Sequence, residues 1–161
     1  MRVLFAHGLE SGPRGRKTAW LRDAGHEVIA PDCRGLDLGV RIAVIVQTLH
    51  ELGPTIVVGS SFGGIAALVA VVDAHAHGLT ASGLLLCAPA LQLPPPPPWP
   101  TDLAPPCACT IVHGVRDEVI PIELSRAFAT KHGTKLIECD DDHSLAASQT
   151  IVLDALASVV A

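Results

Sequence analysis

Tyrosine is absent from this chain, and aromatic residues make up only 3% of its 161 positions. Basic residues are also few, because 11 Lys and Arg stand against 16 Asp and Glu, which leaves a net charge of −5 at pH 7. Proteins that bind nucleic acids usually present a basic face and aromatic side chains on which bases stack. The composition supplies neither, so it argues against nucleic acid as a partner.

Long apolar runs are missing as well. The apolar stretch Phe62–Val72 ends at Asp73, well short of the roughly 18 to 20 residues that cross a bilayer. Near the amino terminus, Val3–Ala6 is too short for the apolar region of a signal peptide. The sequence His7-Gly8 then follows where small residues would mark a cleavage site. We therefore expect no membrane association and a cytoplasmic location.

Cysteine is scarce, and its five positions are odd in number and scattered along the chain. A chain of this length does not depend on disulfides, so we expect free thiols that pack as small apolar side chains. Cys107 and Cys109 would place two sulfur atoms on one face of a strand. No second close pair completes a zinc site, and the sequence therefore predicts neither a metal nor a cofactor.

Apolar residues are plentiful: hydrophobic residues make up 49% of the chain and charged residues 17%, enough for the core of a single domain over residues 1–161. Short β-branched runs alternate with longer helical stretches, which is typical of βαβ units. The expected fold class is a three-layer α/β sandwich around a six-stranded, mostly parallel sheet. The predicted strands are Val3–Ala6, Glu27–Ala30, Thr55–Ser60, Gly83–Cys87, Cys109–His113 and Lys135–Cys139, and the predicted helices are Arg16–Ala24, Leu38–Leu52, Phe62–His77, Pro121–His132 and Ser144–Val160.

Proline makes up half of residues 89–106 and fills the run Pro94–Pro98. Because proline fixes φ and lacks an N–H donor, this run predicts a stiff polyproline II rod of about 15 Å, at roughly 3.1 Å per residue. The segment joins two predicted strands, so we interpret it as a rigid insert over the edge of the sheet. Trp99 could then wall a pocket, or the rod could bind a proline-recognising module.

The sequence Gly59-Ser60-Ser61-Phe62-Gly63 matches G-x-S-x-G and lies between a predicted strand and a predicted helix. In such a turn a serine projects from a strained backbone, and flanking glycines let the strand and helix backbones pass without Cβ collisions. The motif therefore predicts Ser61 as a nucleophile. A glycine-rich turn that only packs tightly is the competing interpretation.

A nucleophilic serine needs a base to take its proton and a carboxylate to orient that base. Asp117 follows the strand that ends at His113, and His143 follows the last predicted strand. Both therefore emerge at the carboxyl edge of a parallel sheet, where α/β proteins bind ligands. We predict His143 as the base and Asp117 as the orienting carboxylate.

Two alternatives stay open around these residues. Glu118 could rotate toward the base in place of Asp117. The run Asp140-Asp141-Asp142-His143 could hold a hard metal ion, although consecutive residues seldom all face one ion. We favour the interpretation that Asp141 or Asp142 caps the following helix or raises the pKa of His143.

A negatively charged reaction intermediate also needs N–H donors. The N–H of Phe62, at a helix start, is one candidate, and the N–H of Leu9, in the loop after the first strand, is the other. An ordinary turn at His7-Gly8 is the competing interpretation of that loop. Close by, Arg14, Arg16 and Lys17 could attract an anionic substrate, although a solvated helix start is the interpretation we favour.

Taken together, these motifs resemble the α/β-hydrolase superfamily, in particular its small serine esterases with little or no lid, such as the YqiA-like group. The resemblance rests on the segments 5–11, 31–35, 59–63, 113–121 and 142–143 and extends over nearly the whole chain. It implies a minimal α/β-hydrolase fold, a triad of Ser61, Asp117 and His143, and an oxyanion hole at Leu9 and Phe62. The proline-rich insert, residues 89–106, would stand in place of the usual cap.

The resulting hypothesis is a monomeric or weakly dimeric serine hydrolase of small carboxylic esters, with short acyl chains favoured because no large cap builds a deep pocket. A thioesterase or acyltransferase that uses the same serine is the first alternative. The second is a non-catalytic module that presents Pro94–Pro98 to a partner.

Overall fold

The computed structural model describes residues 1–160, which form a three-layer α/β sandwich around one parallel sheet. All six predicted strands are confirmed to within one residue at each end. The strand order is β2-β1-β3-β4-β5-β6, and every neighbouring pair is parallel. The strands are β1 Arg2–Ala6, β2 Glu27–Ile29, β3 Ile56–Ser60, β4 Gly83–Cys87, β5 Cys109–Gly114 and β6 Lys135–Cys139.

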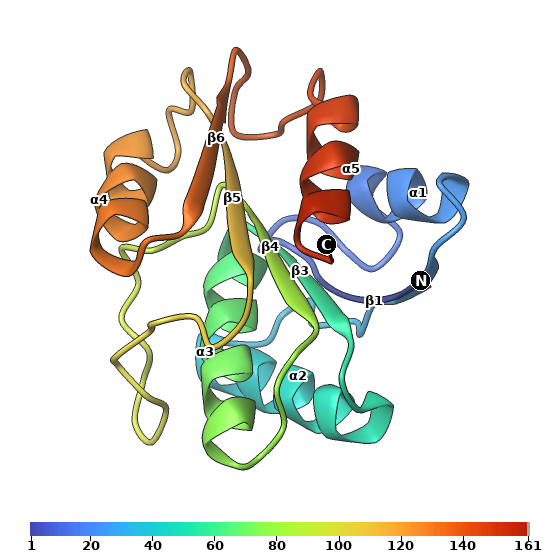
Figure 1. Cartoon of the computed structure of the whole chain (residues 1–161), viewed down its shortest axis with the longest axis vertical. Coiled ribbons are helices and arrows are strands. Elements are labelled where there is room, and N and C mark those ends of the chain that lie inside the picture. Colours follow the sequence, from blue (N-terminus) through green and yellow to red (C-terminus); the bar gives the residue numbers. More distant parts are fainter. Residues whose placement is uncertain (161) are drawn as a thin grey trace.

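Five helices cover the two faces of the sheet (Figure 1). They are α1 Arg16–Asp23, α2 Leu38–Leu52, α3 Phe62–Ala76, α4 Ile122–His132 and α5 Gln149–Ser158. One core cluster lies between the sheet and α2, α3 and α4, and a second lies between the sheet and α1 and α5. The strands β1, β3, β4 and β5 are almost wholly buried between these layers, which explains why their sequences are apolar throughout.

The last helix begins later than predicted, at Gln149 rather than Ser144. Local hydrogen bonds form turns in the intervening segment instead, because Asp142 Oδ1 accepts from the Ser144 N–H and Leu145 has a φ of 56°. Neither Asp141 nor Asp142 occupies the N-cap of α5, so that prediction is wrong. The N-cap is Ser148, and its hydroxyl donates to Asp141 at 2.7 Å.

The proline-rich insert does not form a straight rod. The N–H of Trp99 donates to the Pro96 carbonyl at 3.0 Å, which closes a turn over Pro96–Trp99 at the end of the run. Pro96 and Trp99 pack against Gly39 of α2, where an added Cβ would lie 3.3 Å from Pro96 Cγ and 3.6 Å from Trp99 Nε1. Trp99 therefore packs against α2 and is not among the residues that line the pocket beside Ser61, so of the two roles open from the sequence the structure shows packing.

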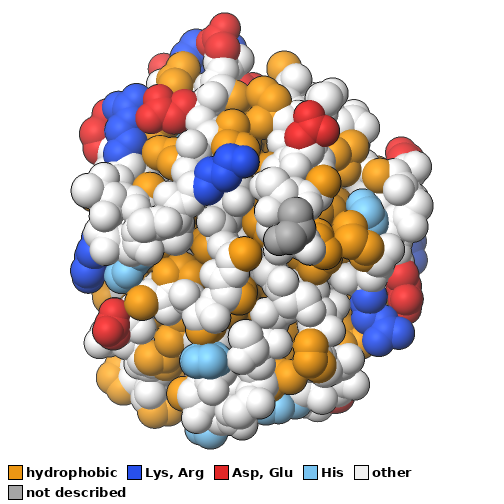
Figure 2. All heavy atoms as spheres, viewed as in Figure 1, with side chains coloured by type: hydrophobic (Ala, Val, Ile, Leu, Met, Phe, Trp, Pro, Cys, Tyr) orange, Lys and Arg blue, Asp and Glu red, His pale blue; other side chains and the backbone are white. Residues whose placement is uncertain are grey.

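The exposed surface in Figure 2 carries charges of both signs side by side. Acidic and basic side chains gather at the top and upper left of this view, over α4 and the ends of β5 and β6 (Figures 1 and 2). In this region Arg126 pairs with Glu138 and Arg116 pairs with Asp140, each at 2.7 Å. Within residues 1–160, no helix is both long enough and apolar enough to cross a membrane.

Candidate active site

Ser61 occupies the sharp turn between β3 and α3. Its φ of 55° lies in the left-handed region that non-glycine residues seldom adopt, so the backbone is strained at this position. The strained turn is held in place because the Ser61 N–H donates to the Cys87 carbonyl, at the end of β4, at 2.9 Å. The side chain consequently projects beyond the carboxyl edge of the sheet.

The glycines of the turn are required by close backbone approaches. A Cβ on Gly59 would lie 2.7 Å from the Gly63 carbonyl oxygen. A Cβ on Gly63 would overlap the carbonyl oxygens of Ala6, the last residue of β1, and of His7, which follows it. The G-x-S-x-G pattern therefore reflects the crossing of α3 over β1 and β3 as well as the conformation of Ser61.

Replacing Gly63 with Ala should lower the free energy of unfolding by at least about 2 to 3 kcal/mol, because rigid backbone cannot move aside for the methyl group. Urea unfolding followed by circular dichroism measures the effect. Gly15→Ala is the matched control, since its added methyl meets nothing closer than 3.5 Å. Equal stability of the two variants would contradict the close approach of α3 to β1.

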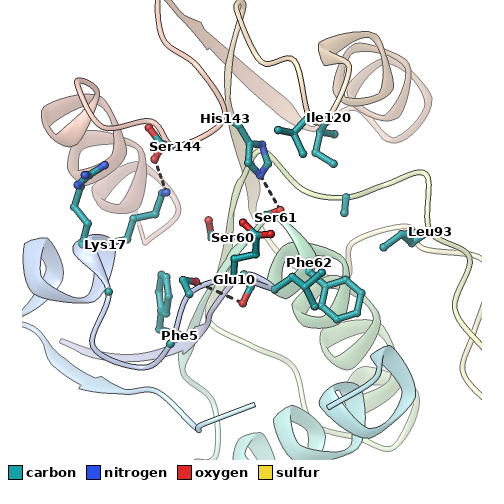
Figure 3. Close-up of a pocket in the computed structure, with 18 of the residues that line it drawn as sticks. Phe5, Glu10, Lys17, Ser60, Ser61, Phe62, Leu93, Ile120, His143 and Ser144 are labelled. Carbon is teal, nitrogen blue, oxygen red and sulfur yellow. Dashed lines mark hydrogen bonds between the residues drawn. The ribbon is translucent and has the colours of Figure 1, made fainter. Parts of the chain in front are cut away.

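His143 and Asp117 lie where Ser61 can use them. His143 Nε2 is 2.9 Å from Ser61 Oγ, and His143 Nδ1 is 2.7 Å from Asp117 Oδ2 (Figure 3 marks the first contact). Because an ionised carboxylate only accepts, Nδ1 carries the imidazole proton and Nε2 accepts from the serine hydroxyl. The Asp117 side chain is fully buried and that of His143 is 24% exposed.

Asp117 is held by more donors than the imidazole alone. Its Oδ1 accepts from the N–H groups of Val119 and Ile120, both at 2.8 Å. Its Oδ2 also lies 3.1 Å from Nε2 of the buried His113. Glu118, the alternative carboxylate, is exposed, and within residues 1–160 His143 contacts Asp117 and not Glu118. These contacts hold the Asp117 carboxylate in a fixed orientation toward His143.

The contact of His113 with Asp117 could not be predicted from the sequence. His113 is fully buried on β5, its Nδ1 lies 2.7 Å from Ser125 Oγ on α4, and its Nε2 lies 3.0 Å from the Ile120 carbonyl. Since a carbonyl only accepts, Nε2 carries the proton and Nδ1 accepts from the Ser125 hydroxyl. The Nε2–H therefore points at the loop that holds Asp117 and helps to fix that carboxylate in place.

The two expected oxyanion donors, Leu9 and Phe62, both line the pocket that contains Ser61. Phe62 is the first residue of α3, and Leu9 follows Gly8 in the loop after β1. Gly8 packs against Ser61, because an added Cβ there would lie 3.6 Å from Ser61 Cβ. Among residues 1–160, no acceptor takes a hydrogen bond from the Leu9 or Phe62 N–H, so both remain available to a ligand.

The loop after β1 is fixed by a buried histidine. His7 Nε2 accepts from the Cys33 N–H at 2.9 Å, so its proton resides on Nδ1, which donates to the Gly8 carbonyl at 2.8 Å. His7 is only 1% exposed. The segment His7-Gly8 is therefore more than a strand-exit turn, because an imidazole locks the orientation of the Gly8–Leu9 peptide.

A pocket of about 510 Å³ opens beside Ser61. Figure 3 shows Phe62, Leu93 and Ile120 on one side of the serine, and Lys17 and Phe5 on the other. Lys17 Nζ donates to the Ser144 carbonyl at 2.8 Å and thereby joins α1 to the loop that carries His143. From the proline-rich insert, Ala90, Gln92 and Leu93 reach the pocket.

The acidic run before His143 is not arranged around a common point. Asp140 pairs with Arg116, Asp141 accepts from Ser148, and Asp142 accepts from Ser144. Among residues 1–160, no group of three or more His, Cys, Asp or Glu side chains is placed to hold a metal ion. These carboxylates organise the turns that deliver His143 to the sheet edge.

Asp141 accepts hydrogen bonds from Ala147 and Ser148 and so holds together the loop that carries His143. The free energy of unfolding should therefore vary with pH. Burial acts to raise the pKa of Asp141, but the hydrogen bonds from Ser148, Asp142 and Ala147 outweigh it and lower the pKa below its usual value. The stability this group contributes is therefore fully present above about pH 4, the value of an unfolded Asp, and is lost as pH falls through the lower folded pKa.

Asp141→Asn should accordingly destabilise the fold by about 1 to 3 kcal/mol at pH 7 and by progressively less below about pH 4. Urea unfolding at several values between pH 3 and pH 7 measures this difference. Asp140→Asn is the control, because the Asp140 side chain is 86% exposed. A difference between Asp141→Asn and the unmodified protein that stays constant over this range would contradict the assignment.

Solved structures of other proteins share this fold. No protein-family model matches the sequence, and no curated protein matches it. A protein from Xanthomonas campestris pv. campestris, described as belonging to the hydrolases of the alpha/beta superfamily, is 26% identical with a TM-score of 0.78, over 99% of this chain and 97% of that one. Est1E from Butyrivibrio proteoclasticus is 17% identical with a TM-score of 0.77, over 98% and 85%. A serine hydrolase without a lid, from Xanthomonas campestris, is 17% identical with a TM-score of 0.75, over 99% and 80%.

Proposed function

Since this chain has the fold of the α/β-hydrolase superfamily, we propose that it is a serine hydrolase that cleaves carboxylic esters. The observation that carries the proposal is the hydrogen-bonded series from Ser61 through His143 to the buried Asp117, with distances of 2.9 and 2.7 Å. Serine is a weak nucleophile at its own pKa, and it reacts when an oriented base removes its proton. Ser61 has such a base in contact.

In the first half of the proposed reaction, His143 Nε2 takes the proton of Ser61 as Oγ attacks the acyl carbon. The carbonyl π electrons move to oxygen, and the Leu9 and Phe62 N–H groups stabilise the resulting oxyanion. When the carbonyl re-forms, the bond to the alkoxy oxygen breaks. His143 then gives its proton to that oxygen, so the alcohol leaves and the acyl group stays on Ser61.

The second half repeats these steps with water. His143 takes a proton from the water as the water oxygen attacks the acyl carbon, and the same two N–H groups receive the new oxyanion. The bond to Ser61 Oγ breaks, and His143 returns the proton to the serine. Asp117 stays ionised throughout and stabilises the imidazolium that forms twice in each cycle.

Short acyl chains are the substrates that the pocket favours. Its volume of about 510 Å³ lies toward the small end of ligand sites, which run from about 300 to 1,000 Å³. Phe62, Leu93 and Ile120 offer apolar contacts beside Ser61, and the insert adds few further walls. We therefore propose acetyl to butyryl esters as the preferred class.

Covalent labelling tests the proposal directly. A fluorophosphonate reacts with serines that a neighbouring base activates, so the protein should gain the mass of one adduct, and peptide mapping should place it on Ser61. Ser158→Ala, which changes an exposed serine at the end of α5, should label at the rate of the unmodified protein. Failure to label, or an adduct on another residue, would refute the proposed function.

A further inference from the structure

The proposed reaction gives no role to Arg41, whose charged side chain is buried. Arg41, in the first turn of α2, is only 1% exposed, although arginine is rarely buried without an acidic partner. Within residues 1–160, no carboxylate pairs with its guanidinium and Nη2 has no hydrogen-bond partner. Such a buried cation costs stability compared with an apolar side chain of similar size. Its position suggests what offsets that cost.

The guanidinium of Arg41 contacts both segments that carry the proposed oxyanion donors. Its Nη1 donates to the His7 carbonyl at 2.8 Å and lies 3.4 Å from the Gly8 carbonyl oxygen. On the other side, its central carbon lies 4.7 Å from the centroid of the Phe62 ring, within the range of a cation–π contact. Arg41 therefore bridges the loop after β1 and the first residue of α3.

The direction of the Leu9 N–H follows from these contacts. In a trans peptide the C=O and N–H bonds point in opposite directions, so fixing the Gly8 carbonyl also fixes the Leu9 N–H. That carbonyl faces His7 Nδ1 and Arg41 Nη1, and the Leu9 N–H consequently points away from the guanidinium. Hydrogen bonds at the carbonyl oxygen also polarise the peptide and make its N–H a stronger donor.

We infer that Arg41 is a positioning residue of the oxyanion hole, which orients the Gly8–Leu9 peptide and places an unpaired positive charge close to the two segments that carry the N–H donors. The inference rests on the proposed function. A positive charge in a water-poor interior acts more strongly on a developing negative charge than it would in water. Arg41 should therefore matter more for the tetrahedral intermediate than for the bound ester.

Substituted proteins separate this role from a purely structural one. Arg41→Met removes the charge at similar length, and Arg41→Lys keeps a charge with a different shape. Arg126→Met, which removes an exposed arginine of α4, is the matched control. For each protein we would measure kcat and KM for p-nitrophenyl acetate and the Ki of phenylboronic acid, which adds to the serine as a tetrahedral anion.

Arg41→Met should lower kcat about 10- to 100-fold, which is no more than the loss expected when one oxyanion-hole donor is removed. Its KM should change less than about threefold. Its Ki for phenylboronic acid should rise by a factor similar to the fall in kcat. Arg41→Lys should lose less than about tenfold in kcat, and Arg126→Met should behave as the unmodified protein. A structural role alone would lower the melting temperature without selectively weakening the boronate.

An unchanged kcat in Arg41→Met, or equal losses in the Met and Lys variants, would overturn the inference. If Arg41→Met does not fold, Arg41→Lys decides: its boronate Ki should rise in step with the fall in kcat, and an unchanged Ki overturns the role. Fluorophosphonate labelling keeps the two proposals distinct. If the unmodified protein is not labelled by the fluorophosphonate, the proposed function and this inference both fail. If the unmodified protein is labelled and Arg41→Met is fully active, only this inference fails.

Discussion

Ser61→Ala is expected to lower kcat for p-nitrophenyl acetate by at least about 10⁴-fold, because the methyl side chain has no oxygen to attack the acyl carbon. The N–H groups of Leu9 and Phe62 would remain, so a small residual rate above that of water should persist. Initial rates at saturating ester measure the loss, at protein concentrations high enough to detect the residual rate.

The folded structure should survive the Ser61→Ala change. Alanine keeps the Cβ, so the strained φ of 55° and the hydrogen bond from this residue's N–H to Cys87 are unaffected. The melting temperature should stay within a few degrees of that of the unmodified protein. A variant that is folded and still turns over ester at the original rate would show that Ser61 is not the nucleophile.

Asp117→Asn should cost about 10⁴-fold in kcat, although it changes a single atom of a side chain that never touches substrate. The Asn oxygen would accept from the Val119 and Ile120 N–H groups in place of Oδ1. The amide nitrogen would then face His143 Nδ1, which must become an acceptor. The imidazole proton would move to Nε2, where it prevents His143 from accepting the proton of Ser61.

Glu118→Gln provides the comparison for Asp117→Asn. Glu118 is adjacent in the chain but exposed, so its loss should change kcat less than about twofold. Rates for both variants on the same ester, with melting temperatures alongside, distinguish the two carboxylates. A larger loss in Glu118→Gln than in Asp117→Asn would reverse the assignment and make Glu118 the orienting group.

Much of the fold can be predicted from the sequence because the sheet is parallel and covered on both faces. Strands such as Gly83–Cys87 are buried at every position, and they stand out as short apolar runs between helices. The candidate site could be located for a related reason. Parallel strands bring the residues that follow them to one edge, so Ser61, Asp117 and His143 could be expected together from their order alone.

Contacts that depend on side-chain direction could not be predicted in the same way. Arg41 lies 34 positions from His7, and nothing in the sequence of α2 shows that this charge points inward. His113 appears in the sequence as one more residue of an apolar strand, yet it faces Asp117 and Ser125. The segment 144–148 contains good helix formers, but hydrogen bonds to Asp141 and Asp142 hold it in turns.

Under the proposed function, the wide chain separation of Ser61 and His143 makes the reactivity of Ser61 depend on complete folding. The two residues are 82 positions apart and meet only when β3, β4, β5 and β6 have assembled side by side. A partly assembled chain would hold an ordinary, unreactive hydroxyl. The fraction of molecules that accept a fluorophosphonate should therefore equal the fraction of completed domains, and labelling would report on refolding and on destabilised variants such as Gly63→Ala.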